Sequence, residues 1–214
     1  MPLRRSTVAV VAAALVSSAL AADARAQAPS QAPTQNAAQA TNPIEPALLA
    51  VPRRPETQAV VDACRDKGRQ ADTRHTLMVF RAAQEILKFK QGYPEIASAD
   101  ALTSEIAVML HDIGGGGLAN AHPGAVIARD VLTGLKERHR FSDAFIAKVA
   151  RIVETHHVTG TVKGQDDGPE WFVVLLADTP RIYNAATGDR DVFAKLVQER
   201  IDQLKAAVRS ATLR

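Results

Sequence analysis

The sequence has little of three features that would each point to a particular class of protein. Its 214 residues include a single cysteine, Cys64, so no disulfide can form within the chain. Cys64 shares an apolar helical stripe with Val60 and Val61, which predicts a small buried side chain. No alternating run of apolar and polar residues with turn signals is present, which argues against β-strands. The formal net charge is only +3, so no nucleic-acid polymer is expected as a partner.

The N-terminal residues 1–26 have the pattern of a signal peptide. Arg4 and Arg5 precede an apolar run at 8–20, and the small residues of Ala24-Arg25-Ala26 predict cleavage after Ala26. The apolar run is shorter than the roughly 20 residues that span a bilayer, so no stable membrane span is expected after cleavage. Cleavage would leave a net charge of about +1. We therefore expect an exported bacterial protein, periplasmic or secreted.

The remaining chain divides into a linker and one domain. Residues 27–54 are rich in Ala, Gln and Pro and have no apolar periodicity, which predicts a disordered linker. Residues 55–214 are enough for one core, with a C-terminal helix. Apolar residues recur there at intervals of three and four, which predicts an all-α fold. The expected helices cover 56–69, 73–90, 100–111, 123–137, 142–157, 169–184 and 189–211.

The segment VMLHDIGGGG contains the first candidate for a metal site. His111 and Asp112 are adjacent at the end of an apolar run, and the glycines at 114–117 permit the backbone to turn. An imidazole and a carboxylate can then reach one divalent cation. The glycines themselves form either a flexible loop or a set of backbone N–H groups facing an anion.

Two further candidate ligands lie in other predicted helices. His75 follows Arg74 at the start of the helix that contains RHTLMV. Asp178 ends the apolar segment FVVLLAD, where burying a carboxylate is costly without a cation or a hydrogen-bond donor.

The order His75, His111-Asp112, Asp178 resembles the H…HD…D pattern of the HD-domain metal-dependent phosphohydrolase superfamily, in its HDIG form. The resemblance extends to local context in RHTLMV, MLHDIGG and LLAD, and it covers about residues 72–184. It implies a single helical bundle with His111 and Asp112 at the catalytic centre.

Three further histidines resemble those of the dinuclear subgroup of this family. His122 lies in AHPGAVIARDVL, and the pair His156 and His157 lies in IVETHHV. The resemblance implies that one metal is held by His75, His111, Asp112 and Asp178. A second metal would be held by His122 and by His156, His157 or both, with Asp112 as the bridge. His139, in the charged KERHR, is expected to be exposed.

The resemblance implies hydrolysis of a small-molecule phosphate ester by a metal-bound hydroxide. The substrate would be a phosphomonoester or phosphodiester, including nucleotide-like compounds. One or two divalent ions per chain are expected, and ligands of nitrogen and carboxylate oxygen suit Fe, Mn, Zn, Co or Ni. Two other functions use the same ligands: an HD-type di-iron oxygenase, and a non-catalytic metal-holding binding module.

The sequence departs from the family pattern in three places. Gly115 stands where many members have a lysine after HDIG, and Thr179-Pro180 follows Asp178 in place of small and acidic residues. Gly92-Tyr93-Pro94 has the letters of the HD-GYP subgroup, which hydrolyses cyclic di-nucleotides, but it precedes the HD motif instead of following the histidine pair. Hydrolysis of cyclic di-GMP is therefore not expected.

Overall fold

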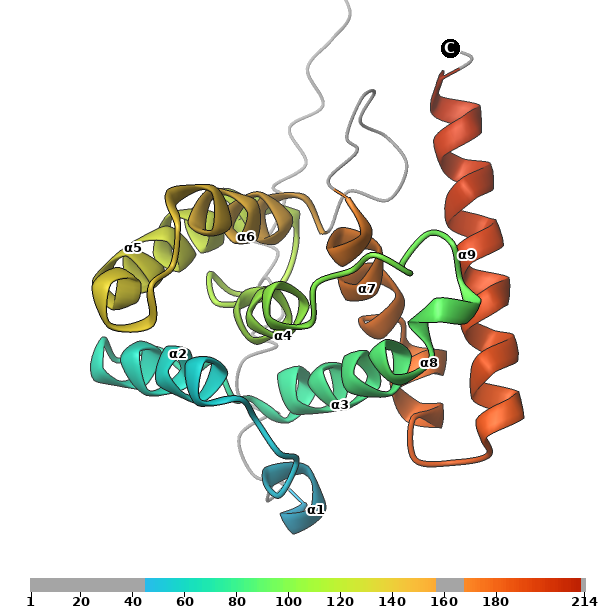
Figure 1. Ribbon diagram of the computed structural model, residues 1–214, viewed down its shortest axis with the longest axis horizontal. Helices are drawn as coiled ribbons and strands as arrows, with labels where there is room; N and C mark the ends of the chain where they lie inside the picture. The colour runs from blue at the N-terminus through green and yellow to red at the C-terminus, as the bar shows by residue number, and fades with distance from the viewer. Residues whose placement is uncertain (1–44, 157–167, 213–214) are drawn as a thin grey trace, which may run out of the picture. The chain divides into compact units, whose positions relative to one another are not determined.

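A computed structural model of the chain describes residues 45–156 and 168–212, and these residues form helices with no β-strand among them (Figure 1). The all-α prediction is confirmed. The helices are α1 (Pro46–Leu49), α2 (Pro55–Asp66), α3 (Arg74–Lys88), α4 (Ala101–Leu110), α5 (Ala121–His139), α6 (Asp143–Thr155), α7 (Pro169–Ala177), α8 (Pro180–Ala185) and α9 (Arg190–Thr212). Short 3₁₀ turns lie at Lys90–Gly92 and Leu118–Asn120. The predicted signal peptide, residues 1–26, lies outside the described residues.

Three helices begin at side chains that accept a hydrogen bond from the backbone. Thr73 accepts from the N–H of Thr76 at 3.1 Å, Asp100 from Thr103 at 2.7 Å, and Ser142 from Phe145 at 3.1 Å. Each bond satisfies one of the backbone donors that a helix leaves without a partner in its first turn, and such caps contribute about 1 kcal/mol each. The starts of α3, α4 and α6 are thereby fixed by the sequence.

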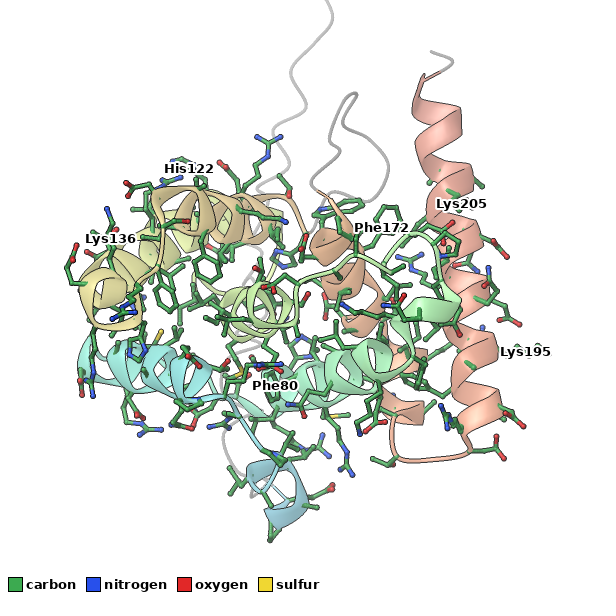
Figure 2. The ribbon with its side chains drawn as sticks, in the orientation of Figure 1. Phe80, His122, Lys136, Phe172, Lys195 and Lys205 are labelled. Atoms are coloured by element: carbon green, nitrogen blue, oxygen red, sulfur yellow. The ribbon has the colours of Figure 1, made fainter. Side chains whose placement is uncertain are left out.

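Helix α4 is at the centre of the packing and contacts α2, α3, α6 and α7 (Figure 1). Every residue from Thr103 to Leu110 is buried. Around α4 pack large side chains such as Phe80, which is fully buried on α3 (Figure 2). Burying an apolar side chain of that size stabilises the fold by about 1.5–3 kcal/mol. The helix that ends at the HD motif is therefore enclosed by other helices on several sides.

Two features differ from the sequence prediction. The expected helix over 169–184 is two helices, because Pro180 has no N–H to continue α7, and α8 begins at that proline. The predicted linker also contains α1, whose Leu48 is only 5% exposed and which packs on α3. The apolar PALLAV segment supplies a side chain to bury, and this outweighs the polar composition of the residues before it.

Three single-residue interpretations can be compared with the structure. Cys64 is buried as predicted, and burial raises the pKa of its thiol to about 11. Tyr93 of the GYP letters is a structural residue, since it is buried and its hydroxyl donates to the carbonyl of Ala194 on α9 at 3.1 Å. His139 is half-buried, not exposed as expected, because its ring stacks on Phe141 at 5.6 Å.

Within the described residues, no helix is both long enough and apolar enough to cross a membrane.

Candidate metal centre

Three helix ends bring together His75, His111 and Asp178. His75 lies in the first turn of α3, whose start Thr73 fixes, while His111 and Asp178 are the C-terminal cap residues of α4 and α7. The apolar residues of α4 and α7 are buried, so their last residues are held at fixed positions against α3. One ligand atom from each of the three residues lies within 4.8 Å of the others.

The distances within this group suit a small cation. His75 Nε2 lies 3.2 Å from His111 Nε2 and 3.1 Å from Asp178 Oδ1, and His111 Nε2 lies 3.8 Å from the same oxygen. Atoms that bind a transition metal at about 2.0–2.2 Å lie about 3 Å apart when they subtend a right angle at the ion. The group His75, His111 and Asp178 could therefore hold a metal ion.

Asp112 lies beside this group and faces two different sets of imidazoles. Its Oδ2 is 3.5 Å from His75 Nε2 and 3.4 Å from His111 Nε2. Its Oδ1 is 3.6 Å from Nε2 of His156, which is the C-terminal cap residue of α6 and is buried. The carboxylate therefore lies between His156 on one side and His75 and His111 on the other.

Backbone carbonyls fix which nitrogen His111 and His156 present to the centre. His111 Nδ1 lies 2.7 Å from the carbonyl of Val108, and His156 Nδ1 lies 2.8 Å from that of Val153. A carbonyl can only accept, so each Nδ1 donates and each neutral ring has its lone pair on Nε2. Both Nε2 atoms then face the Asp112 carboxylate, where a cation or a proton between nitrogen and oxygen would be stabilised.

The pKa values in the group reflect burial and proximity. For His111, burial lowers the pKa because the imidazolium would lose its hydration. For His75, the hydrogen bond to Asp178 raises the pKa against a smaller effect of burial. For Asp112, burial acts to raise the pKa, but it is outweighed when the histidines are protonated, by a hydrogen bond from His156 and by the positive charges of His111 and His156, so the pKa lies well below its ordinary value. Asp112 is thus ionised at neutral pH.

His122 has a different environment. It lies in the first turn of α5, its side chain is 77% exposed, and its Nδ1 is 2.8 Å from Oε1 of Glu154 near the end of α6. Figure 2 shows His122 on the outer side of the α5 and α6 pair. Among the described residues it is not a member of the converging group. His157, the other predicted ligand of this set, lies outside the described residues.

The glycine run packs closely against the start of α5. A Cβ on Gly114 would lie 2.6 Å from the carbonyl oxygen of Asn120 and 2.6 Å from the nitrogen of Gly124, so no side chain fits there. Gly115 has a φ of +98°, which disfavours any residue with a Cβ at this position. A Cβ on Gly116 would lie 3.9 Å from Asp112 Oδ2, so this residue faces the carboxylate.

Two residues near these histidines were not found from the sequence. Tyr183 on α8 packs its ring against that of His75, with 5.7 Å between ring centroids. Glu154 pairs with Nδ1 of His122. In the sequence, only its place two residues before His156 indicates that it lies near the predicted ligands. No sequence periodicity points to Tyr183, because its contact depends on the turn at Pro180.

Comparison with known proteins adds no relative: no family model, no curated protein and no solved structure matches this chain.

Proposed function

We propose that the protein is a metal-dependent phosphohydrolase of the HD-domain type. The observation that carries the proposal is the convergence of His75, His111 and Asp178 at the ends of three helices, with ligand atoms within 4.8 Å of one another. These are three of the four residues that the H…HD…D resemblance selects from the sequence, the fourth being Asp112. The three residues come from segments more than thirty positions apart in the sequence. Their proximity in space is independent of the sequence pattern and supports the resemblance.

The carboxylate of Asp112 supports a centre of two metals. Its Oδ2 faces His75 and His111, and its Oδ1 faces His156, so each oxygen has its own set of nitrogen donors. One metal would be held by His75, His111, Asp112 and Asp178. The other would be held by Asp112, by His122, and by His156, His157 or both.

The charge of such a centre favours an anionic substrate. Asp112 and Asp178 contribute two negative charges, so two divalent ions would leave a net charge of about +2 for a phosphate ester. When bound, the ions would lower the pKa of a coordinated water from about 15.7 towards 7 and neutralise ester oxygens. The protein contributes the fixed Nε2 atoms of His111 and His156 and the ionised Asp112. The proposed substrate is a small-molecule phosphomonoester or phosphodiester.

The metal is proposed to be Fe, Mn, Zn, Co or Ni, because imidazole and carboxylate ligands suit these ions. The proposed location is outside the cytoplasm, on the signal-peptide pattern of residues 1–26.

The metal centre is tested by the metal content of the purified mature chain and of matched histidine variants. His75→Ala should lose bound metal, whereas His139→Ala should keep it, because His139 stacks on Phe141 and is outside the group. Circular dichroism verifies that both variants fold. Equal metal content in the two variants would overturn the proposed centre, and fewer than two ions in the wild type would overturn its dinuclear form.

The activity is tested with phosphomonoesters, phosphodiesters and nucleotides in the presence of Mn, Fe or Zn. Phosphate release should disappear in Asp112→Ala and persist in His139→Ala. Iron-dependent oxygen uptake without phosphate release would instead indicate that the protein is an HD-type di-iron oxygenase. A metal-loaded protein that is inert in both assays would show the binding module.

A further inference from the structure

The three histidines nearest Asp112 are held in two different ways. His111 and His156 each donate from Nδ1 to the carbonyl three residues earlier, at 2.7 and 2.8 Å. That carbonyl is available because both residues cap the C-terminal end of a helix. His75 is in the first turn of α3, and the residue three positions before it, Asp72, precedes the helix. In the described part of the chain, His75 has no such carbonyl bond to fix its ring.

Tyr183 supplies a different restraint on His75. The two ring centroids are 5.7 Å apart and the ring planes meet at 81°, an edge-to-face arrangement. Aromatic pairs of this geometry are favoured beyond simple burial, because the positive edge of one ring meets the negative face of the other. The contact limits rotation of the imidazole about its side-chain bonds.

The position of Tyr183 is itself well fixed. Its backbone N–H bonds to the carbonyl of Thr179 at 3.0 Å, and its neighbour Ile182 is only 1% exposed. Tyr183 lies five residues after Asp178, whose Oδ1 is 3.1 Å from His75 Nε2. One short segment, 178–183, therefore holds His75 both at Nε2 and at its ring.

We infer that Tyr183 is a positioning residue for metal binding, whose aromatic ring holds the His75 imidazole with Nε2 directed at the centre. This inference rests on the proposed metal centre and adds a residue to it. The aromatic ring of Tyr183 positions His75, and the Tyr183 hydroxyl is not required for this. His75 is 40% exposed at its side chain, whereas His111 is 0% exposed. His75 is thus the less enclosed of the two, and less of the surrounding structure holds its ring.

The test compares Co²⁺ binding to Tyr183→Leu and Tyr183→Phe by calorimetry. Tyr183→Leu removes the ring and should weaken binding roughly tenfold, the lower end of what loss of a ligand-orienting neighbour causes. Tyr183→Phe keeps the ring and should bind as the wild type does. Tyr183→Met, a second non-aromatic replacement, should behave like Tyr183→Leu.

The control is Phe193→Leu on α9. Phe193 meets Phe89 in a similar arrangement, at 5.6 Å and 78°, and this ring pair contains no candidate ligand. Phe193→Leu should lower the melting temperature and leave Co²⁺ affinity per folded molecule unchanged. Wild-type affinity in Tyr183→Leu, or equal weakening in Tyr183→Phe, would overturn the inference.

A second measurement needs no metal. In the metal-free protein, the ¹⁵N and ¹H signals of the His75 ring should report one ring orientation in the wild type and Tyr183→Phe, and averaging between orientations in Tyr183→Leu. An unaltered His75 signal in Tyr183→Leu would overturn the inference by itself. Absence of Co²⁺ binding in the wild type would instead contradict the proposed function, while this measurement still decides the role of Tyr183.

Discussion

The domain contains two arrangements of histidine beside carboxylate, and they differ in enclosure. His111 is 0% exposed at its side chain and lies close to two carboxylates, whereas His122 is 77% exposed and pairs with Glu154. In the first arrangement, packed helices hold the ligand atoms before any ion arrives. In the second, water surrounds the pair and screens its charges. Residue type alone therefore does not determine metal affinity, since the pre-positioned group avoids the cost of ordering its side chains.

The largest expected effect contrasts these two histidines. His111→Ala should lower the affinity for the first metal by 100-fold or more, roughly 2.7 kcal/mol or above, because it removes a buried ligand from a fixed set. His122→Ala should leave that first affinity within about twofold. Titration with Co²⁺ measures both. The comparison would fail if His122→Ala weakened the first site as much as His111→Ala does.

A smaller effect is expected from lysine placed in the glycine run beside the centre. Gly115→Lys should destabilise the fold by about 1–2 kcal/mol, because the φ of +98° is unfavourable for a residue with a Cβ. Gly116→Lys has no positive φ to adopt, so it should fold normally and weaken metal binding, since its ammonium group can pair with Asp112. Urea unfolding and Co²⁺ titration separate the two. Equal stability of both variants would show that the loop relaxes at 115.

The pH dependence of the metal-free protein should distinguish His75 from His111. The raised pKa of His75 gives stabilisation that is present below its ordinary value of 6.5 and is lost as pH rises through the folded pKa. The lowered pKa of His111 acts oppositely, so its contribution is present above 6.5 and is lost as pH falls. The stability lost in His75→Ala should therefore be greater at pH 5.5 than at pH 8.5, and that lost in His111→Ala should be greater at pH 8.5. Urea unfolding at the two pH values measures this; losses independent of pH would contradict it.

The smallest expected effect is in the exposed pair. Glu154→Gln should change the free energy of unfolding by less than about 1 kcal/mol, because exposed ion pairs are weak in water. If His122 binds the second metal, the variant should nevertheless weaken that site, because Glu154 directs Nε2 of His122 away from itself. Chemical denaturation and metal stoichiometry provide the two measurements. A loss of several kcal/mol in stability would mean that this pair is buried in solution.

The fold and the convergence of His75, His111 and Asp178 were largely predictable from the sequence. Apolar periodicity marked the helices, because it depends on local chemistry. The burial expected for Asp178 is only partial, since 25% of its side chain is exposed. The hydrogen bonds from Nδ1 of His111 and His156 to backbone carbonyls arise because both residues cap the C-terminal end of a helix. The sequence motif alone does not show where those helices end.

Other parts depend on contacts between distant residues. The ring of Tyr183 reaches His75 only because Pro180 ends α7 and starts a new helix in a different direction. Glu154 meets His122 because α5 and α6 lie side by side, a pairing of residues 32 positions apart. No pattern within a single helix encodes either contact.

The close approach of Gly114 to Gly124 has a mechanical consequence. With two backbones in contact and no side chain between them, the loop after Asp112 lies directly on the first turn of α5. A residue with a Cβ at position 114 would have to displace this loop from α5, and Asp112 is only two residues earlier in the chain.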